Sequence, residues 1–119
     1  MRDPKAVVRE LVDAYNAKAV DRLVDLYHPD GRMWTPFERG GIVGHEAIGR
    51  SIRGLFDAYP EERMTIELLV GDDTHAVAEF RSVGLGPADA EVRFTEVYEV
   101  RDGRIVECRV YIDPEELPA

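Results

Sequence analysis

Residues 91–112 read EVRFTEVYEVRDGRIVECRVYI, and this stretch decides the fold of the chain. It contains two runs rich in β-branched and aromatic residues, separated by Asp102-Gly103. These two residue types tolerate the positive φ angles that a two-residue type I′ turn requires. The stretch therefore predicts an antiparallel β-hairpin.

Side chains alternate between the two faces of a strand, so every second residue of the first run lies on one face. The residues of that face are Val92, Phe94, Glu96, Tyr98 and Val100. A carboxylate on an otherwise apolar face is costly to desolvate, so it is paired, protonated or used in function. Glu96 is therefore the first candidate for a functional residue.

The length and composition of the chain fit one globular domain covering residues 1–119. Hydrophobic residues make up 45% of it, which is too many for a disordered chain. The formal net charge of −9 argues against binding to nucleic acid or to an anionic membrane. Because no apolar run is long enough to span a membrane and the N-terminus lacks the apolar core of a signal peptide, we expect a cytoplasmic protein.

Cysteine and histidine give no indication of a metal site. The single cysteine, Cys108, cannot form an internal disulfide, and it is expected to be a small core residue. The three histidines, His28, His45 and His75, are scattered without the spacing of zinc ligands. We therefore expect neither a metal nor another cofactor.

Three helices are predicted in the first half of the chain. Asp3-Pro4 provides an N-cap acid followed by proline, and apolar residues at three- and four-residue spacing continue the helix to about Ala17. A shorter helix is predicted over residues 20–28 and a third over residues 45–58, ended by Tyr59-Pro60.

The second half changes from helical to strand periodicity. The other predicted segments are a short strand at 32–35, a loop at 36–44, strands at 64–70 and 74–83, a connection at 84–89, and a turn of helix after Asp113-Pro114. Together with the hairpin, these give four antiparallel strands over residues 64–112. Helices followed by a meander indicate an α+β fold, with the helices on one face of a curved sheet.

Four short motifs support a family resemblance. They are Leu26-Tyr27-His28-Pro29-Asp30, Thr35-Pro36, Gly44-His45-Glu46-Ala47-Ile48 and Asp102-Gly103-Arg104-Ile105-Val106-Glu107. In this order they resemble the NTF2-like superfamily, and within it the SnoaL-like polyketide cyclases and the ketosteroid isomerases. The resemblance implies a cone-shaped α+β barrel with a deep pocket and a homodimer formed through the outer sheet face. Its members include isomerases, cyclases, epoxide hydrolases, dehydratases and adaptors, so the fold alone leaves the function open.

The resemblance to the isomerases holds at one catalytic position and fails at two. Their general-base aspartate corresponds to Thr35, which cannot remove a carbon-bound proton at neutral pH, and their oxyanion-hole tyrosine corresponds to Leu11. Their second oxyanion donor, a protonated aspartate in an apolar wall, corresponds to Glu96. Cyclase-like members place an acid on the last strand, where this chain has Val110.

The strand next to Glu96 can face the pocket with either of two sets of side chains. The resemblance favours the set Val77, Glu79, Arg81 and Val83. The alternative set, which is more apolar, is Ala76, Ala78, Phe80 and Ser82. On the favoured parity the candidate catalytic residues are Glu96, Glu79 and Arg81, because an arginine can hold one carboxylate ionised while the other acts as an acid or base. Epoxide-opening relatives also use two acids and an arginine.

The remaining pocket residues come from the helices, the first strand and the hairpin. The candidate substrate-binding residues are Tyr15, Met33, Thr35, Leu55, Phe56, Phe94, Tyr98, Cys108, Val110 and Ile112. Each polar candidate also has a structural interpretation: Glu79 and Arg81 as a cross-strand ion pair on the outer face, and Glu96 as a buried carboxyl satisfied by a neighbour.

Two classes of function follow from this pocket. The first is a cofactor-independent isomerase, lyase, cyclase or hydrolase that acts on a small apolar or cyclic molecule. The second is a non-catalytic ligand-binding protein or a dimeric adaptor. In both cases we expect a homodimer, because the outer sheet face retains Val97, Tyr111 and Trp34.

Overall fold

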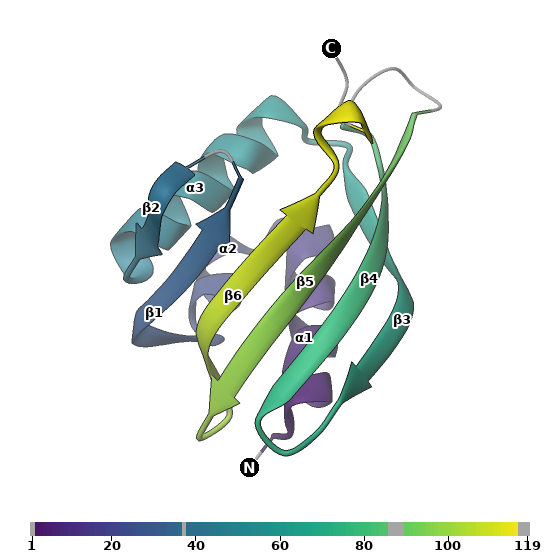
Figure 1. Cartoon of the computed structure of the whole chain (residues 1–119). Coiled ribbons are helices and arrows are strands. Elements are labelled where there is room, and N and C mark those ends of the chain that lie inside the picture. Colours follow the sequence, from purple (N-terminus) through teal and green to yellow (C-terminus); the bar gives the residue numbers. More distant parts are fainter. Residues whose placement is uncertain (1, 37, 86–89, 117–119) are drawn as a thin grey trace.

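A computed structural model of the chain describes residues 2–36, 38–85 and 90–116. It shows an α+β fold in which three helices cover one face of a curved six-stranded sheet (Figure 1). The helices are α1 (Pro4–Asn16), α2 (Val20–Val24) and α3 (His45–Ala58), and a 3-10 turn, η1, covers Pro114–Glu116. The strands are β1 (Tyr27–Thr35), β2 (Glu38–Val43), β3 (Arg63–Gly71), β4 (His75–Val83), β5 (Glu91–Arg101) and β6 (Arg104–Ile112).

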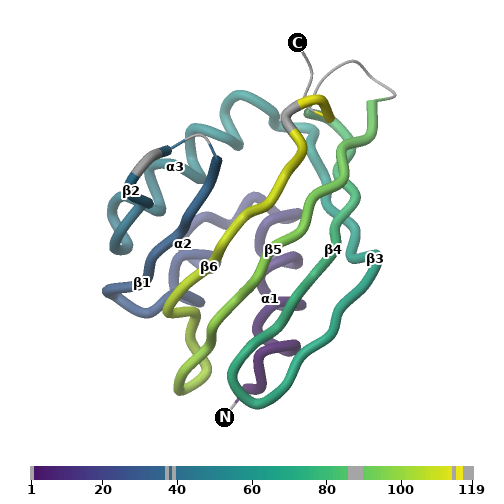
Figure 2. The backbone as a smooth tube through the Cα atoms, in the orientation of Figure 1, coloured from purple at the N-terminus to yellow at the C-terminus, as the bar shows by residue number. Residues whose placement is uncertain are grey.

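The order of the strands in the sheet is β2-β1-β6-β5-β4-β3. Strands β1 and β6 run parallel, and the other neighbouring pairs are antiparallel. In the backbone trace, β3, β4 and β5 curve over α1, whereas α3 lies against β1 and β2 (Figure 2). The sheet therefore wraps around the helices.

The hairpin of β5 and β6 confirms the prediction from residues 91–112. Asp102 and Gly103 both have positive φ angles, 52° and 75°, as the two-residue turn requires. The register places Glu96 opposite Val110 and Tyr98 opposite Cys108. Tyr98 is fully buried, so the predicted apolar face of β5 does face the helices.

The N-terminal helix also begins as predicted. The Asp3 carboxylate accepts a hydrogen bond of 2.8 Å from the backbone N–H of Ala6, and Pro4 occupies the first turn, where its missing N–H costs nothing. Val7 and Val8 on the apolar side of α1 are fully buried. None of the helices in the described part of the chain is long and apolar enough to cross a membrane.

Residues 20–44 differ from the prediction in two ways. The second helix ends at Val24 instead of near residue 28, because Tyr27 to Gly31 already belong to β1, which pairs with β6. The predicted loop at 36–44 contains β2, which pairs with β1. In β2, the positive φ angles of Gly40 and Gly41 allow the chain to bend. Pairing with the free edge of the sheet thus overrides the local turn signals.

Candidate functional site

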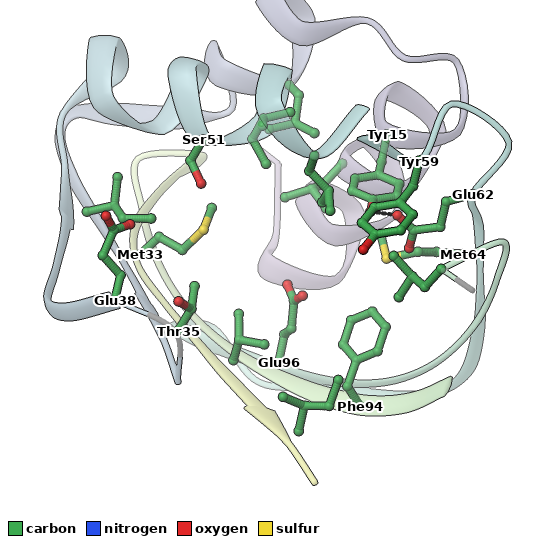
Figure 3. A pocket seen from close by; sticks show the side chains of 18 of the residues that line it. Tyr15, Met33, Thr35, Glu38, Ser51, Tyr59, Glu62, Met64, Phe94 and Glu96 are labelled. Atoms are coloured by element: carbon green, nitrogen blue, oxygen red, sulfur yellow. Dashed lines mark hydrogen bonds between the residues drawn. The ribbon is translucent and has the colours of Figure 1, made fainter. Parts of the chain in front are cut away.

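A cavity of about 520 Å³ lies between the helices and the inner face of the sheet (Figure 3). Its wall is mainly apolar and includes residues of each helix and of all strands except β4. Eight of the predicted pocket residues line it: Tyr15, Met33, Thr35, Leu55, Phe94, Glu96, Val110 and Ile112. This volume lies in the usual range for small-molecule sites.

Three other predicted pocket residues lie behind the wall. Phe56 packs edge-on against Tyr15, with 5.1 Å between the ring centroids. Tyr98 and Cys108 are fully buried, and both contact Glu96. These residues support the cavity from behind and do not line it.

The expected parity of β4 is wrong. Directly opposite residues of an antiparallel pair lie on the same face, and Ala78 is opposite Glu96. Ala76, Ala78, Phe80 and Ser82 are fully buried, whereas Glu79 is exposed on the outer face. Of the two alternative sets of β4 side chains, the more apolar one faces inward, because a sheet buries the face that carries more apolar surface.

Arg81 also lies on the outer face, so it cannot assist Glu96. Its guanidinium forms ion pairs with Glu67 at 3.2 Å and with Glu91 at 3.4 Å. All three side chains are partly exposed, and such surface pairs contribute little to stability. The predicted set of two carboxylates and one arginine therefore does not form.

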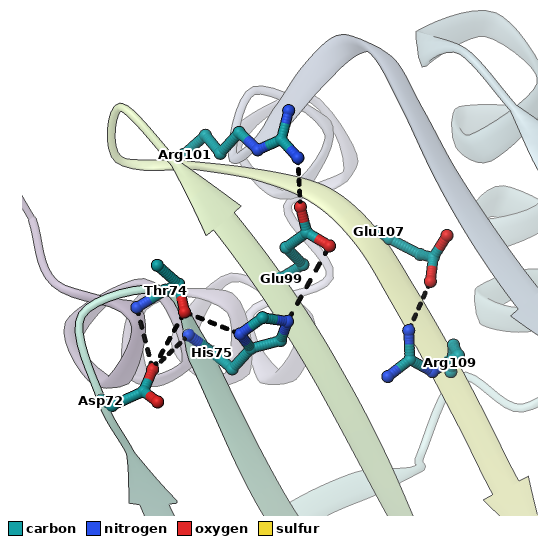
Figure 4. Close-up of polar contacts among 7 residues, drawn as sticks. All are labelled: Asp72, Thr74, His75, Glu99, Arg101, Glu107 and Arg109. Carbon is teal, nitrogen blue, oxygen red and sulfur yellow. Dashed lines mark hydrogen bonds and ion pairs between the residues drawn. The ribbon is translucent and has the colours of Figure 1, made fainter.

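The outer face carries several other polar contacts of the same kind (Figure 4). Glu99 pairs with Arg101 at 2.8 Å and approaches His75 at 3.8 Å, and Glu107 pairs with Arg109 at 2.5 Å. These pairs are at least partly exposed and point away from the cavity, so we assign them a structural role.

Glu96 points into the cavity from β5 (Figure 3). The Tyr98 hydroxyl donates a hydrogen bond of 2.5 Å to its Oε1, and the Cys108 thiol donates a longer one of 3.4 Å to the same atom. Both contacts end on Oε1, so neither of these hydrogen bonds uses Oε2. Burial raises the pKa of this carboxyl above its ordinary value, because desolvation outweighs the two hydrogen bonds that lower it.

The groups behind Glu96 stay protonated at neutral pH. Burial raises the pKa values of the Cys108 thiol and of the Tyr27 and Tyr98 hydroxyls well above their ordinary values. A thiol needs its ionised form to act as a nucleophile, so Cys108 is a core residue and a hydrogen-bond donor. The prediction that it packs in the core is confirmed.

The structure adds a second carboxylate that sequence reasoning missed. Glu62, in the connection between α3 and β3, lines the cavity and is only 1% exposed. Its two oxygens accept hydrogen bonds from the hydroxyls of Tyr15 and Ser82, and the latter bond is 2.5 Å long. The Lys18 ammonium donates to the backbone carbonyl of Glu62 at 2.5 Å. No periodic pattern marks a residue in a connection, and its partners lie on distant elements.

The positions at which the isomerase and cyclase patterns fail do lie at the cavity. Leu11, Thr35 and Val110 all line it, in agreement with the resemblance. The wall therefore presents uncharged side chains where those relatives present a tyrosine or an acid. Within the described part of the chain, no group of three histidine, cysteine, aspartate or glutamate side chains is arranged to hold a metal ion.

The sequence matches the SnoaL-like domain over residues 8–108. No curated protein matches the chain. Solved structures with the same fold include a protein from Catenulispora acidiphila with a ketosteroid isomerase-like fold, in complex with trimethylamine. It shares 16% identity over 96% of this chain and 90% of its own, with a TM-score of 0.85.

Two further solved structures carry functional names. A protein from Sinorhizobium meliloti named as a polyketide cyclase shares 22% identity over 87% of this chain and 92% of its own, with a TM-score of 0.77. A protein from Kribbella flavida named as a ketosteroid isomerase shares 21% identity over 97% and 81%, with a TM-score of 0.79. At these identities the likeness shows the fold alone. Because the domain match covers most of the sequence, the chain belongs to the SnoaL-like domain family.

Proposed function

We propose that the protein binds a small apolar, cyclic molecule in the cavity and that Glu96 exchanges a proton with it, without a cofactor. The observation that supports this most directly is the position of Glu96. Its carboxyl lines a mainly apolar cavity from the centre of the sheet, and burial raises its pKa. Carboxyls tuned in this way serve as general acids and bases near neutral pH.

The contacts of Glu96 fit a proton-transfer role. In its protonated form, it can donate a hydrogen bond to a ketone or epoxide oxygen of the ligand. In its ionised form, it can remove a proton from the ligand. Tyr98 and Cys108 hold Oε1 in either state, so the carboxyl keeps its orientation while the proton moves. General acid–base catalysis by one such group contributes about 10²–10⁴ in rate.

The reaction class that fits is isomerisation, cyclisation, dehydration or epoxide opening on a ring that carries one oxygen. The ligand would be held by the apolar walls, and Glu96 would act on that oxygen or on a neighbouring carbon. One specific observation favours a non-catalytic binding protein as the second candidate: Leu11 and Thr35 replace two catalytic groups of the isomerases and line the same wall.

The experiment compares turnover by Glu96→Gln with turnover by the wild type on a panel of cyclic ketones and epoxides. Glutamine keeps the shape of the side chain but cannot transfer a proton, so turnover should fall about 10²-fold or more while ligand affinity stays similar. Glu79→Gln is the matched control, because it removes a carboxylate from the outer face of the adjacent strand. Turnover by Glu96→Gln at the wild-type rate would leave only the binding function.

A further inference from the structure

Among the residues that the structure describes, the charged side chains that line the cavity are all acidic. Among the described residues of its wall, the ionisable groups of Asp, Glu, Lys, Arg and His type are Glu38, Glu62 and Glu96. They come from β2, from the connection between α3 and β3, and from β5, so they approach the cavity from different sides (Figure 3). No lysine, arginine or histidine occurs among these described wall residues.

The two inner acids influence each other. The charge of Glu62 is one of the causes that raise the pKa of Glu96, and the charges of both acids raise the pKa of Tyr15. Charges interact strongly in a cavity of low dielectric constant because little water screens them. A negative group brought into the cavity would experience the same repulsion.

The other polar side chains among the described wall residues are hydroxyls, those of Tyr15, Tyr27, Thr35, Ser51 and Tyr59, and none of them brings a positive charge to offset that of a negative ligand. The hydroxyl of Tyr15 already donates to Glu62, as does that of Ser82, which lies outside the lining set. The Lys18 ammonium donates to the backbone carbonyl of Glu62 and lies over the rings of Tyr15 and Phe56, 5.1 and 4.8 Å from their centroids. Lys18 therefore already has partners, and it is not one of the residues that line the cavity.

From this distribution we infer that the cavity selects its ligand by charge: it takes an apolar ring carrying a neutral or positively charged polar group and rejects the same ring carrying a carboxylate or phosphate. The inference rests on the cavity being the ligand site, as in the proposed function, but not on proton transfer by Glu96. A neutral oxygen can accept a hydrogen bond from protonated Glu96. An ammonium can pair with the ionised form of the same carboxyl.

The test uses three probes with one skeleton: adamantan-1-ol, adamantan-1-amine and adamantane-1-carboxylate. Their affinities for the whole protein are measured by calorimetry at pH 8 and low salt, where the carboxyl groups are most ionised and screening is weakest. We expect the alcohol and the amine to bind, and the carboxylate to bind at least about ten-fold more weakly. Raising the salt concentration should reduce this difference in affinity, because salt screens the repulsion between the carboxylate and the acids of the wall.

Variants identify the source of the selection. Glu38→Gln and Glu96→Gln each remove an acid from the wall, so each should reduce the gap in affinity between the alcohol and the carboxylate. Glu79→Gln removes a charge from the outer face and should leave the gap unchanged. Carboxylate affinity equal to that of the alcohol, or binding of none of the probes at millimolar concentration, would overturn the inference. Because no turnover is measured, a failed charge test and a failed proton-transfer test are distinguishable.

Discussion

Tyr15 on α1 donates its hydroxyl hydrogen to the carboxylate of Glu62, which lies in the connection between α3 and β3 (Figure 3). Ser82 on β4 donates to the other oxygen of the same carboxylate. One buried side chain thus joins a helix, a connection and a strand that are far apart in sequence. It also fixes the position of the Tyr15 ring, which forms part of the cavity wall.

Removal of this carboxylate should destabilise the fold. In Glu62→Ala the hydroxyls of Tyr15 and Ser82 lose their acceptor inside the protein, and each unsatisfied buried group costs about 1–3 kcal/mol. Urea denaturation followed by circular dichroism measures the free energy of unfolding. Glu61→Ala is the matched control, because Glu61 is exposed next to Glu62 in the same connection. Equal stabilities of the two variants would show that the buried contacts contribute nothing.

The stability of the protein should also depend on the ionisation of Glu96. Its pKa is raised in the folded state, so the folded chain holds this proton at pH values at which the unfolded chain has lost it. The contribution of Glu96 to stability is therefore fully present below the unfolded value of about 4.3 and is lost as the pH rises through the folded pKa.

The side chain of Glu96→Gln cannot ionise, so the variant does not lose this stability as the pH rises. The stability of the variant relative to the wild type should therefore increase from pH 4.5 to pH 8. Paired urea denaturation curves across this range measure the difference, and Glu79→Gln provides the control with an exposed acid on the neighbouring strand. A difference that is constant with pH would mean that Glu96 titrates at its ordinary value in the folded protein.

The ion pairs of Arg81 should contribute little. The side chain is partly exposed on the outer face, where it pairs with Glu67 and Glu91. Arg81→Ala should change the free energy of unfolding by no more than about 1 kcal/mol and should leave ligand affinity unchanged. Denaturation and calorimetry test both statements. A large loss of affinity would place Arg81 in the function of the cavity after all.

The sequence predicted what depends on local patterns. The turn at Asp102-Gly103 and the alternation around Glu96 identified the hairpin and the inward carboxyl. The parity of β4 could not be predicted, because Glu79 and Ala78 are neighbours and only burial of the whole sheet decides which of them faces inward. Strand β2 depends on pairing with β1, and Glu62 depends on partners from α1 and β4. Such long-range contacts leave no periodic trace in sequence.

We expect the protein to form a homodimer through the outer face of the sheet. Tyr111 on β6 is 56% exposed and Leu68 on β3 is 53% exposed, so apolar area remains on strands that already pack their other face on the helices. Exposed apolar area of this kind commonly marks an interface. Analytical ultracentrifugation should give twice the chain mass of 13.4 kDa at micromolar concentration. Tyr111→Glu should shift the equilibrium toward the monomer, and a monomeric wild type would contradict the proposal.

Conversion of a Δ5-3-ketosteroid should be negligible. Thr35 lines the cavity where the isomerases carry their general-base aspartate, and a neutral hydroxyl cannot remove a carbon-bound proton at neutral pH. Leu11 lines it where they carry a hydrogen-bonding tyrosine, so the developing oxyanion would also lack one donor. The absence of a general base alone reduces the rate about 10²–10⁴-fold.

The assay follows the ultraviolet absorbance of the conjugated product with wild type, Thr35→Asp and Thr35→Asn. Aspartate supplies a carboxylate at the wall and asparagine supplies only its shape, so any gain should appear in the first variant alone. Rapid conversion by the wild type would mean that another residue of the cavity, with Glu62 and Glu96 as the first candidates, already serves as the base.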